Sequence, residues 1–87
     1  MQFRGTVLDG DAIVALDVEG TYQSDSFGGA SKSWSGRMSV PADAVIREGE
    51  NYMLRMADGR EVTITVSETT YTGEGGTVWF KGKGQAP

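Results

Sequence analysis

Apolar side chains at every second position are the feature that most limits what this chain can fold into. The clearest runs are 51–57 and 60–67, in which the alternating apolar residues are Tyr52, Leu54, Met56, Val62, Ile64 and Val66. A period of two places successive side chains on opposite faces of a β-strand, so that each run buries one face and leaves the other in water. The same pattern predicts strands at about 2–8, 11–18, 33–40, 51–57, 60–67 and 77–82.

Two Asp-Gly dipeptides separate these runs in pairs, Asp9-Gly10 and Asp58-Gly59. Asp-Gly suits a two-residue type I′ turn, in which both central residues have positive φ. Each dipeptide therefore predicts a β-hairpin. Strands with a single buried face must curl or stack, so the chain is predicted to be all-β: a small antiparallel barrel or two-layer sandwich of about six strands.

The alternation also predicts which side chains face the core. The expected inward residues of two further runs are Val14, Leu16, Val18, Trp34, Gly36, Met38 and Val40. Glycines at 5, 20 and 36 are plausible sites for a kink or bulge. At most one short helical turn is expected, over 41–46, with Val45 and Ile46 closing one end of the core.

The chain has 87 residues, which predicts one domain over 1–82 and a disordered tail over 83–87. The segment 23–33 is rich in Gly and Ser and predicts a flexible loop. No apolar run reaches the length of a membrane span, and the N-terminus has no signal-peptide core, so a cytoplasmic location with no membrane contact is expected.

Residue types that are missing from the sequence narrow the chemistry. There is no Cys and no His, so disulfides, thiolate metal sites and the usual Ser-His or Cys-His nucleophiles are excluded. Carboxylates alone remain for catalysis, and Glu50 and Glu61 are candidates for such a pair, although nothing in the sequence marks them as buried or paired. A calcium site at Asp9, Asp11 and Asp58 matches only a fragment of a calcium loop. We therefore expect no enzyme activity, no cofactor and no metal.

The residues left for recognition lie on the outward side of the predicted strands, except for Phe27, which lies in the 23–33 loop. This candidate partner surface consists of Trp79, Met53, Arg55, Arg37, Lys81 and Phe27. Trp, Met and Arg are enriched where proteins recognise each other, provided that their strands are neighbours. The alternatives are that Trp79 covers one open end of the barrel or lies under the 23–33 loop, and that Phe27 fastens this loop to the barrel.

These observations favour a small non-catalytic binding or assembly module. Its partner is expected to be another protein or a second copy of the chain, including strand addition at an uncovered sheet edge. The alternative is an OB-like or SH3-like barrel that binds single-stranded nucleic acid through Trp79 and its neighbouring cations. The formal net charge of −4 makes nucleic acid the less favoured partner.

Overall fold

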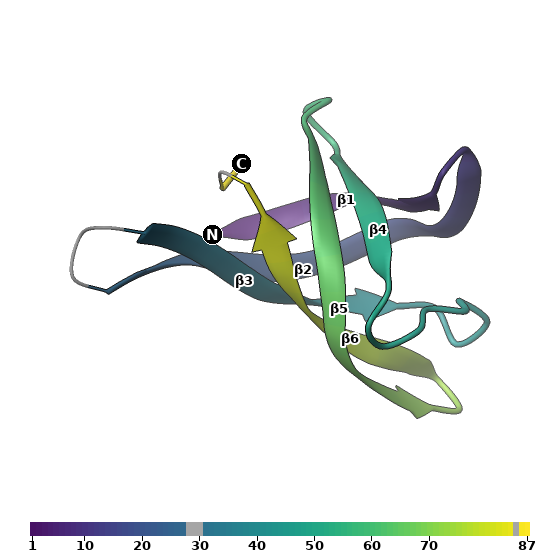
Figure 1. Ribbon diagram of the computed structural model, residues 1–87. Helices are drawn as coiled ribbons and strands as arrows, with labels where there is room; N and C mark the ends of the chain where they lie inside the picture. The colour runs from purple at the N-terminus through teal and green to yellow at the C-terminus, as the bar shows by residue number, and fades with distance from the viewer. Residues whose placement is uncertain (28–30, 85) are drawn as a thin grey trace.

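The computed structural model describes residues 1–27, 31–84 and 86–87, without the side chains of 25–27, 31 and 32. These residues form six antiparallel strands: β1 (Gln2–Asp9), β2 (Ala12–Phe27), β3 (Ser31–Val40), β4 (Asn51–Met56), β5 (Glu61–Thr72) and β6 (Gly75–Lys83). The strands close into a barrel in the order β1-β2-β3-β6-β5-β4, with β4 returning to β1 (Figure 1). The predicted all-β fold is confirmed, in its barrel form.

The barrel encloses a core in which most inward side chains are shielded from solvent. The largest fully buried side chains are Trp34, Phe80, Met38, Leu54 and Ile64. Trp34 makes edge-to-face contacts with Tyr22 and Phe80, with ring centroids 6.0 Å apart in both pairs. The inward faces predicted for the runs 33–40, 51–57 and 60–67 are therefore confirmed, although Gly36 and Val62 are only half-buried.

The facing predicted for the run 11–18 holds at Val18, which is buried, at Val14, which packs against the core, and at Ile13 and Asp17, which are exposed, but it is wrong at Ala15 and Leu16. In the β1–β2 ladder Gly5 pairs with Val18 and Val7 with Ala15, so β2 has an extra residue at this point, and a second irregularity follows between Val7 and Leu8. Bulges of this kind shift the alternation of side chains. Consequently Ala15 is buried, whereas Leu16 is 58% exposed.

The two Asp-Gly hairpins are confirmed, but their turns differ from type I′. Asp9 pairs with Ala12, so the two central residues are Gly10 and Asp11, and of these only Gly10 has positive φ. A positive φ at the first central residue alone is typical of a type II′ turn. In the second hairpin Gly59 has positive φ and Asp58 does not, because residues 57–60 form a longer connection.

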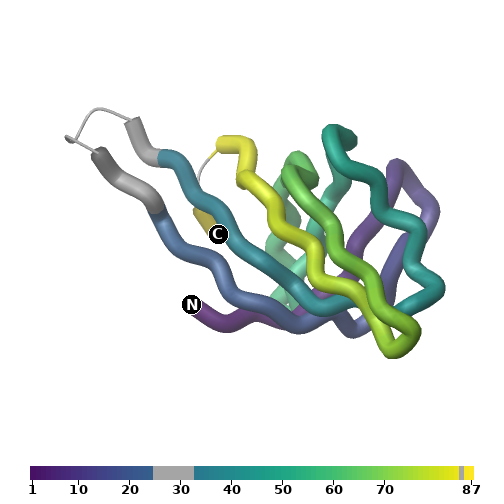
Figure 2. The backbone as a smooth tube through the Cα atoms, turned by 90° about the horizontal axis from the view of Figure 1, so that it is seen from below, coloured from purple at the N-terminus to yellow at the C-terminus, as the bar shows by residue number. Residues whose placement is uncertain are grey.

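The segment 23–33 was predicted to be a loop, yet its described parts are strand. The β2–β3 ladder continues as far as Phe27 and Ser31, beyond the point where β1 begins at Gln2. Figure 2 shows β2 and β3 continuing side by side past the start of β1. A two-stranded arm has no buried face, so its residues follow no apolar alternation, although backbone pairing persists.

The segment between β3 and β4 contains a turn and no helix among the described residues. The N–H of Ala44 donates to the carbonyl oxygen of Pro41 at 3.1 Å. Ala44 and Ile46 are buried, but Val45 is 67% exposed, so the prediction that Val45 closes the core is wrong. Residues 44–46 follow the turn at 42–43, and their side chains alternate, so that 44 and 46 face the barrel and 45 faces solvent.

Tyr52 fastens this segment to the barrel. Its buried hydroxyl accepts a hydrogen bond from the N–H of Arg47 at 3.0 Å and donates to Glu50 at 3.3 Å. Burial raises the pKa of Tyr52 above its ordinary value of 10.0, the Glu50 carboxylate acts in the same direction, and the Arg47 N–H opposes them. The folded protein thus keeps the Tyr52 proton to a higher pH than the unfolded chain does.

We predict that stability falls as the pH rises through about 10, because the unfolded chain then releases the Tyr52 proton first. The urea midpoint should drop between about pH 8 and pH 10.5, and the drop should be smaller for Tyr52→Phe, which has no phenol at this position. An equal drop in both proteins would show that Tyr52 does not contribute to the alkaline loss.

Two glycines allow close packing at one end of the barrel. A Cβ at Gly36 would overlap the carbonyl oxygen of Thr21 on β2, and one at Gly82 would overlap the indole ring of Trp34. Glycine at these positions lets the strands curl tightly around the large aromatic core. The ends of the chain lie at this end of the barrel as well, where the N-terminal amine of Met1 donates to the Tyr22 carbonyl oxygen at 2.7 Å.

Candidate functional site: the Trp79 groove

Trp79 lies on the outer side of β6, between the buried residues Val78 and Phe80. It is half-buried rather than fully exposed, and it pairs in register with Arg37 of β3 and Glu68 of β5. A bulge in β5 brings the Ser67 hydroxyl close enough to donate to the carbonyl oxygen of Trp79 at 3.1 Å. The outward direction predicted for Trp79 agrees with this position.

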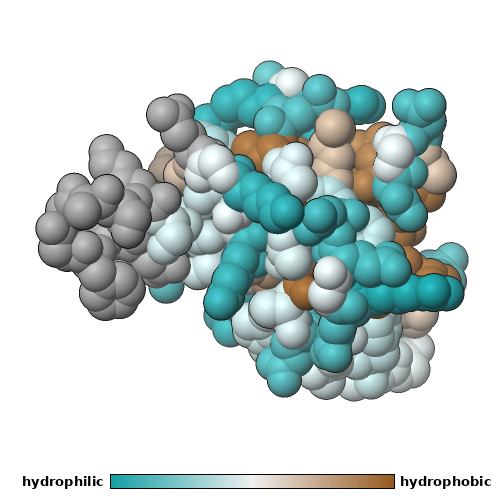
Figure 3. Space-filling view, viewed as in Figure 1, coloured by the Kyte–Doolittle hydropathy of each residue, from teal (hydrophilic) through white to brown (hydrophobic). Residues whose placement is uncertain are grey.

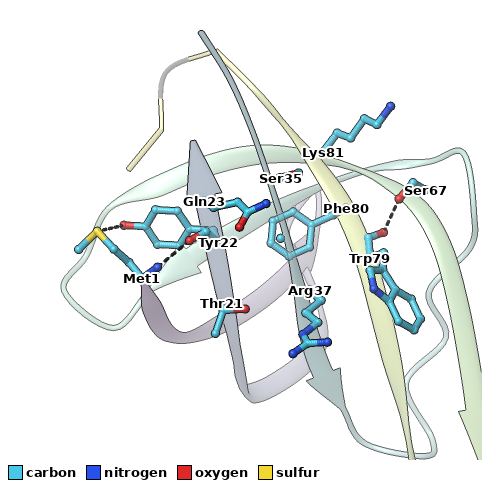
Figure 4. A pocket seen from close by; sticks show the side chains of 11 residues that line it. Met1, Thr21, Tyr22, Gln23, Ser35, Arg37, Ser67, Trp79, Phe80 and Lys81 are labelled. Atoms are coloured by element: carbon cyan, nitrogen blue, oxygen red, sulfur yellow. Dashed lines mark hydrogen bonds between the residues drawn. The ribbon is translucent and has the colours of Figure 1, made fainter. Parts of the chain in front are cut away.

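A shallow groove of about 500 Å³ runs across the outer surface of β2, β3 and β6 beside Trp79. Its polar and aromatic part, which we call the Trp79 face, consists of Gln23, Ser35, Arg37, Ser67, Trp79 and Lys81. Figure 4 shows Arg37 next to Trp79, with Lys81 further along β6 and extending away from it. No carboxylate is among the groove-lining residues whose side chains the structure describes.

The cations of this face form no ion pair with any side chain that the structure describes. Arg4, Arg55 and Arg60 are held in exposed ion pairs with Glu19, Glu61 and Asp58. Arg37, Lys81 and the nearby Lys83 have no ion-pair partner among the residues that the structure describes. The nearest carboxylate in register is Glu68, across Trp79 on β5. An acidic chain thus presents a locally basic surface here.

The other members of the predicted partner surface lie elsewhere. Met53 and Arg55 are on β4, which β5 separates from β6, and Arg55 is bound to Glu61 at 2.9 Å. The side chain of Phe27 lies outside the described residues. The structure therefore brings together Arg37, Trp79 and Lys81, and it places Met53 and Arg55 on a different side of the barrel.

A second surface was not anticipated from the sequence. Leu8 pairs with Ile13 of β2 and with Met53 of β4, so that these side chains form an outward row across three strands. We call this row, together with the exposed Leu16 three residues further along β2, the outer apolar patch. Ile13 is 59% exposed and Met53 37% exposed, while Leu8 is buried between them without belonging to the main core. The bulges of β2 have no local sequence signal that would have revealed it.

The carboxylates considered for metal binding or catalysis are dispersed. Within the described residues, no group of three or more Asp or Glu side chains is placed to hold a metal ion. Asp58 lies in a different turn from Asp9 and Asp11. Its carboxylate accepts a hydrogen bond from the Arg60 N–H at 3.0 Å, and this bond, together with the Arg60 side chain, lowers the pKa of Asp58.

Glu50 and Glu61 are also far apart. Glu61 pairs with Arg55 in the ladder, and Arg55 is five residues along the chain from Glu50, which corresponds to about 16 Å of extended strand. Glycosidase carboxylates lie within about 9.5 Å of each other. These two residues therefore do not form a pair of that kind.

Comparison with models of known protein families, with curated proteins and with solved structures finds no match to this chain. In the described part of the chain, no helix is long and apolar enough to cross a membrane.

Proposed function

We propose that this protein is a non-catalytic binding module that holds a partner protein on its Trp79 face. The observation that carries the proposal is a half-buried tryptophan beside two cations, Arg37 and Lys81, in a groove with no carboxylate among its described lining residues. Trp and Arg dominate the binding energy of many protein interfaces. Cations without ion-pair partners favour a partner segment that carries Asp or Glu, because opposite charges increase association rate and specificity.

The groove lies on the wall of a closed barrel, which restricts how a partner engages it. In the barrel each strand pairs with two neighbours, so the backbone groups there are already used. Strand addition is therefore confined to the two-stranded arm of β2 and β3, which extends beyond β1. Side-chain recognition is the mode that the groove supports.

Single-stranded nucleic acid is the second candidate for the same face. The position of Arg37 beside Trp79 favours it, because bases stack on aromatic rings and cations contact the backbone. The chain as a whole has 12 acidic and 8 basic residues, so a polyanion is repelled by most of the molecule. A short acidic segment that contacts only the groove avoids this repulsion.

Selection from a random linear peptide library on the immobilised protein tests the proposal. We expect peptides rich in Asp and Glu, whose affinity falls about 30-fold or more on Trp79→Ala, as for an interface hot spot. Arg37→Ala should also weaken binding. Arg47→Ala removes the same charge from an exposed position outside the groove and should leave affinity within about twofold.

The same proteins should be titrated with an oligothymidylate while tryptophan fluorescence is recorded. Salt-sensitive oligothymidylate binding that is lost in Trp79→Ala, with no peptide selected, would replace the proposal with the nucleic-acid alternative. Selected peptides that bind Trp79→Ala as tightly as the unmodified protein would show that the groove is not the site.

A further inference from the structure

The outer apolar patch and the Trp79 face lie on opposite sides of the barrel. The patch is centred on β1 and the Trp79 face on β6, and in the closed order β1-β2-β3-β6-β5-β4 these strands are three positions apart in either direction. A single protomer therefore presents two different surfaces that point away from each other.

The patch is an apolar surface with an acidic border. Ile13 and Leu16 are each more than half exposed and Met53 is 37% exposed. The exposed residues Asp9, Asp11 and Asp17 lie in the adjoining turn and bulge, and none of these carboxylates has an ion-pair partner in the described part of the chain. Figure 3 shows hydrophobic side chains reaching the surface over β4 and the β1–β2 hairpin, next to hydrophilic ones.

Each of the two surfaces offers what the other lacks. The patch provides apolar area and carboxylates, and the Trp79 face provides an aromatic ring with Arg37 and Lys81 as cations. Apolar clusters exposed on a protein mark interaction sites, and complementary charge around an apolar centre is the usual composition of an interface. Because every copy of the chain has both surfaces, the Trp79 face of one copy can bind the outer apolar patch of another, and no other protein is needed.

We propose that copies of this chain associate head to tail, with the Trp79 face of one copy docked on the outer apolar patch of the next. The inference rests on the proposed function, since it uses the same recognition face and names a second copy as the partner. An interface between two different surfaces leaves one of each free, so the association continues into a ring or an open chain of protomers.

Sedimentation velocity over a concentration series tests the inference with three variants. The weight-average sedimentation coefficient of the unmodified protein should increase as its concentration rises. Trp79→Ala, which damages the face, and the double variant Ile13→Ser/Leu16→Ser, which damages the patch, should each have an association constant at least about tenfold lower. Val45→Ser changes an equally exposed apolar residue outside the patch and should associate as the unmodified protein does.

Mixing the two damaged proteins gives the decisive result. Each retains one intact surface, so an equimolar mixture should form a 1:1 dimer and stop there, although neither protein associates alone. Far-UV circular dichroism and thermal unfolding would establish that both variants are folded, which the exposure of Ile13 and Leu16 and the outward position of Trp79 favour. Raising the salt concentration should weaken the dimer, because the charges lie at the surface.

Three results would overturn the inference: an unmodified protein that stays monomeric to about 1 mM, a patch variant that associates as before, or a mixture that forms no dimer. Failure of this inference is distinguishable from failure of the proposed function. A monomeric protein that selects acidic peptides through Trp79 retains the proposed function and loses the self-association.

Discussion

Replacing Trp34 with alanine should lower the free energy of unfolding by about 3–5 kcal/mol, the range measured for large aromatic residues in well-packed cores. Trp34 is 1% exposed, contacts Tyr22 and Phe80 edge to face, and lies against the bare backbone of Gly82. Gly82 has no side chain that could fill the space that the indole leaves. Urea unfolding followed by circular dichroism measures the loss.

Trp34→Phe is the informative comparison. The indole Nε1 is buried and has no hydrogen-bond acceptor among the described residues. A buried donor without a partner costs about 1–3 kcal/mol, and phenylalanine removes that donor while keeping an aromatic ring in the core. We therefore expect a clearly smaller loss for Trp34→Phe than for Trp34→Ala. Equal losses would mean that the Nε1 group does find an acceptor, such as a bound water.

Ile64→Ala should cost about 2–5 kcal/mol, as a large-to-small change at a fully buried position. Ile64 faces the core from β5, opposite Tyr52 of β4. The neighbouring Thr65 points outward and donates to the Asn51 side chain at 2.7 Å, so Thr65→Ala should cost no more than about 1 kcal/mol. Similar losses in chemical denaturation would contradict the observed facing of β5.

The sequence predicts those parts of the fold in which one local rule acts alone. In β4 and β5 the alternation around Leu54 and Ile64 has no interruption, so burial follows it closely. In β2 it fails at Ala15 and Leu16, because the bulges opposite Thr6 and Val7 depend on how β1 and β2 fit together in a closed barrel. Nothing in the residues themselves distinguishes Leu16, which is exposed, from an inward leucine.

The candidate site shows the same division. Alternation correctly turns Trp79, Arg37 and Lys81 outward, since each lies beside an inward neighbour on its own strand. Which strands are adjacent is decided by topology: β6 lies between β3 and β5, so that Arg37 meets Trp79 while Met53 does not. The outer apolar patch depends on both the bulges and the closure of β1 onto β4, and for that reason it emerges only from the structure.

Barrel closure has a consequence for how quickly this chain reaches its native state. The two pairings that seal the barrel join Val7 with Leu54 and Arg37 with Trp79, residues that are 47 and 42 positions apart in the sequence. Small proteins dominated by such distant pairings fold in about milliseconds to seconds rather than microseconds. Until those pairings form, the hairpins have unsealed edges, and this interval is when newly made chains are most exposed to aggregation.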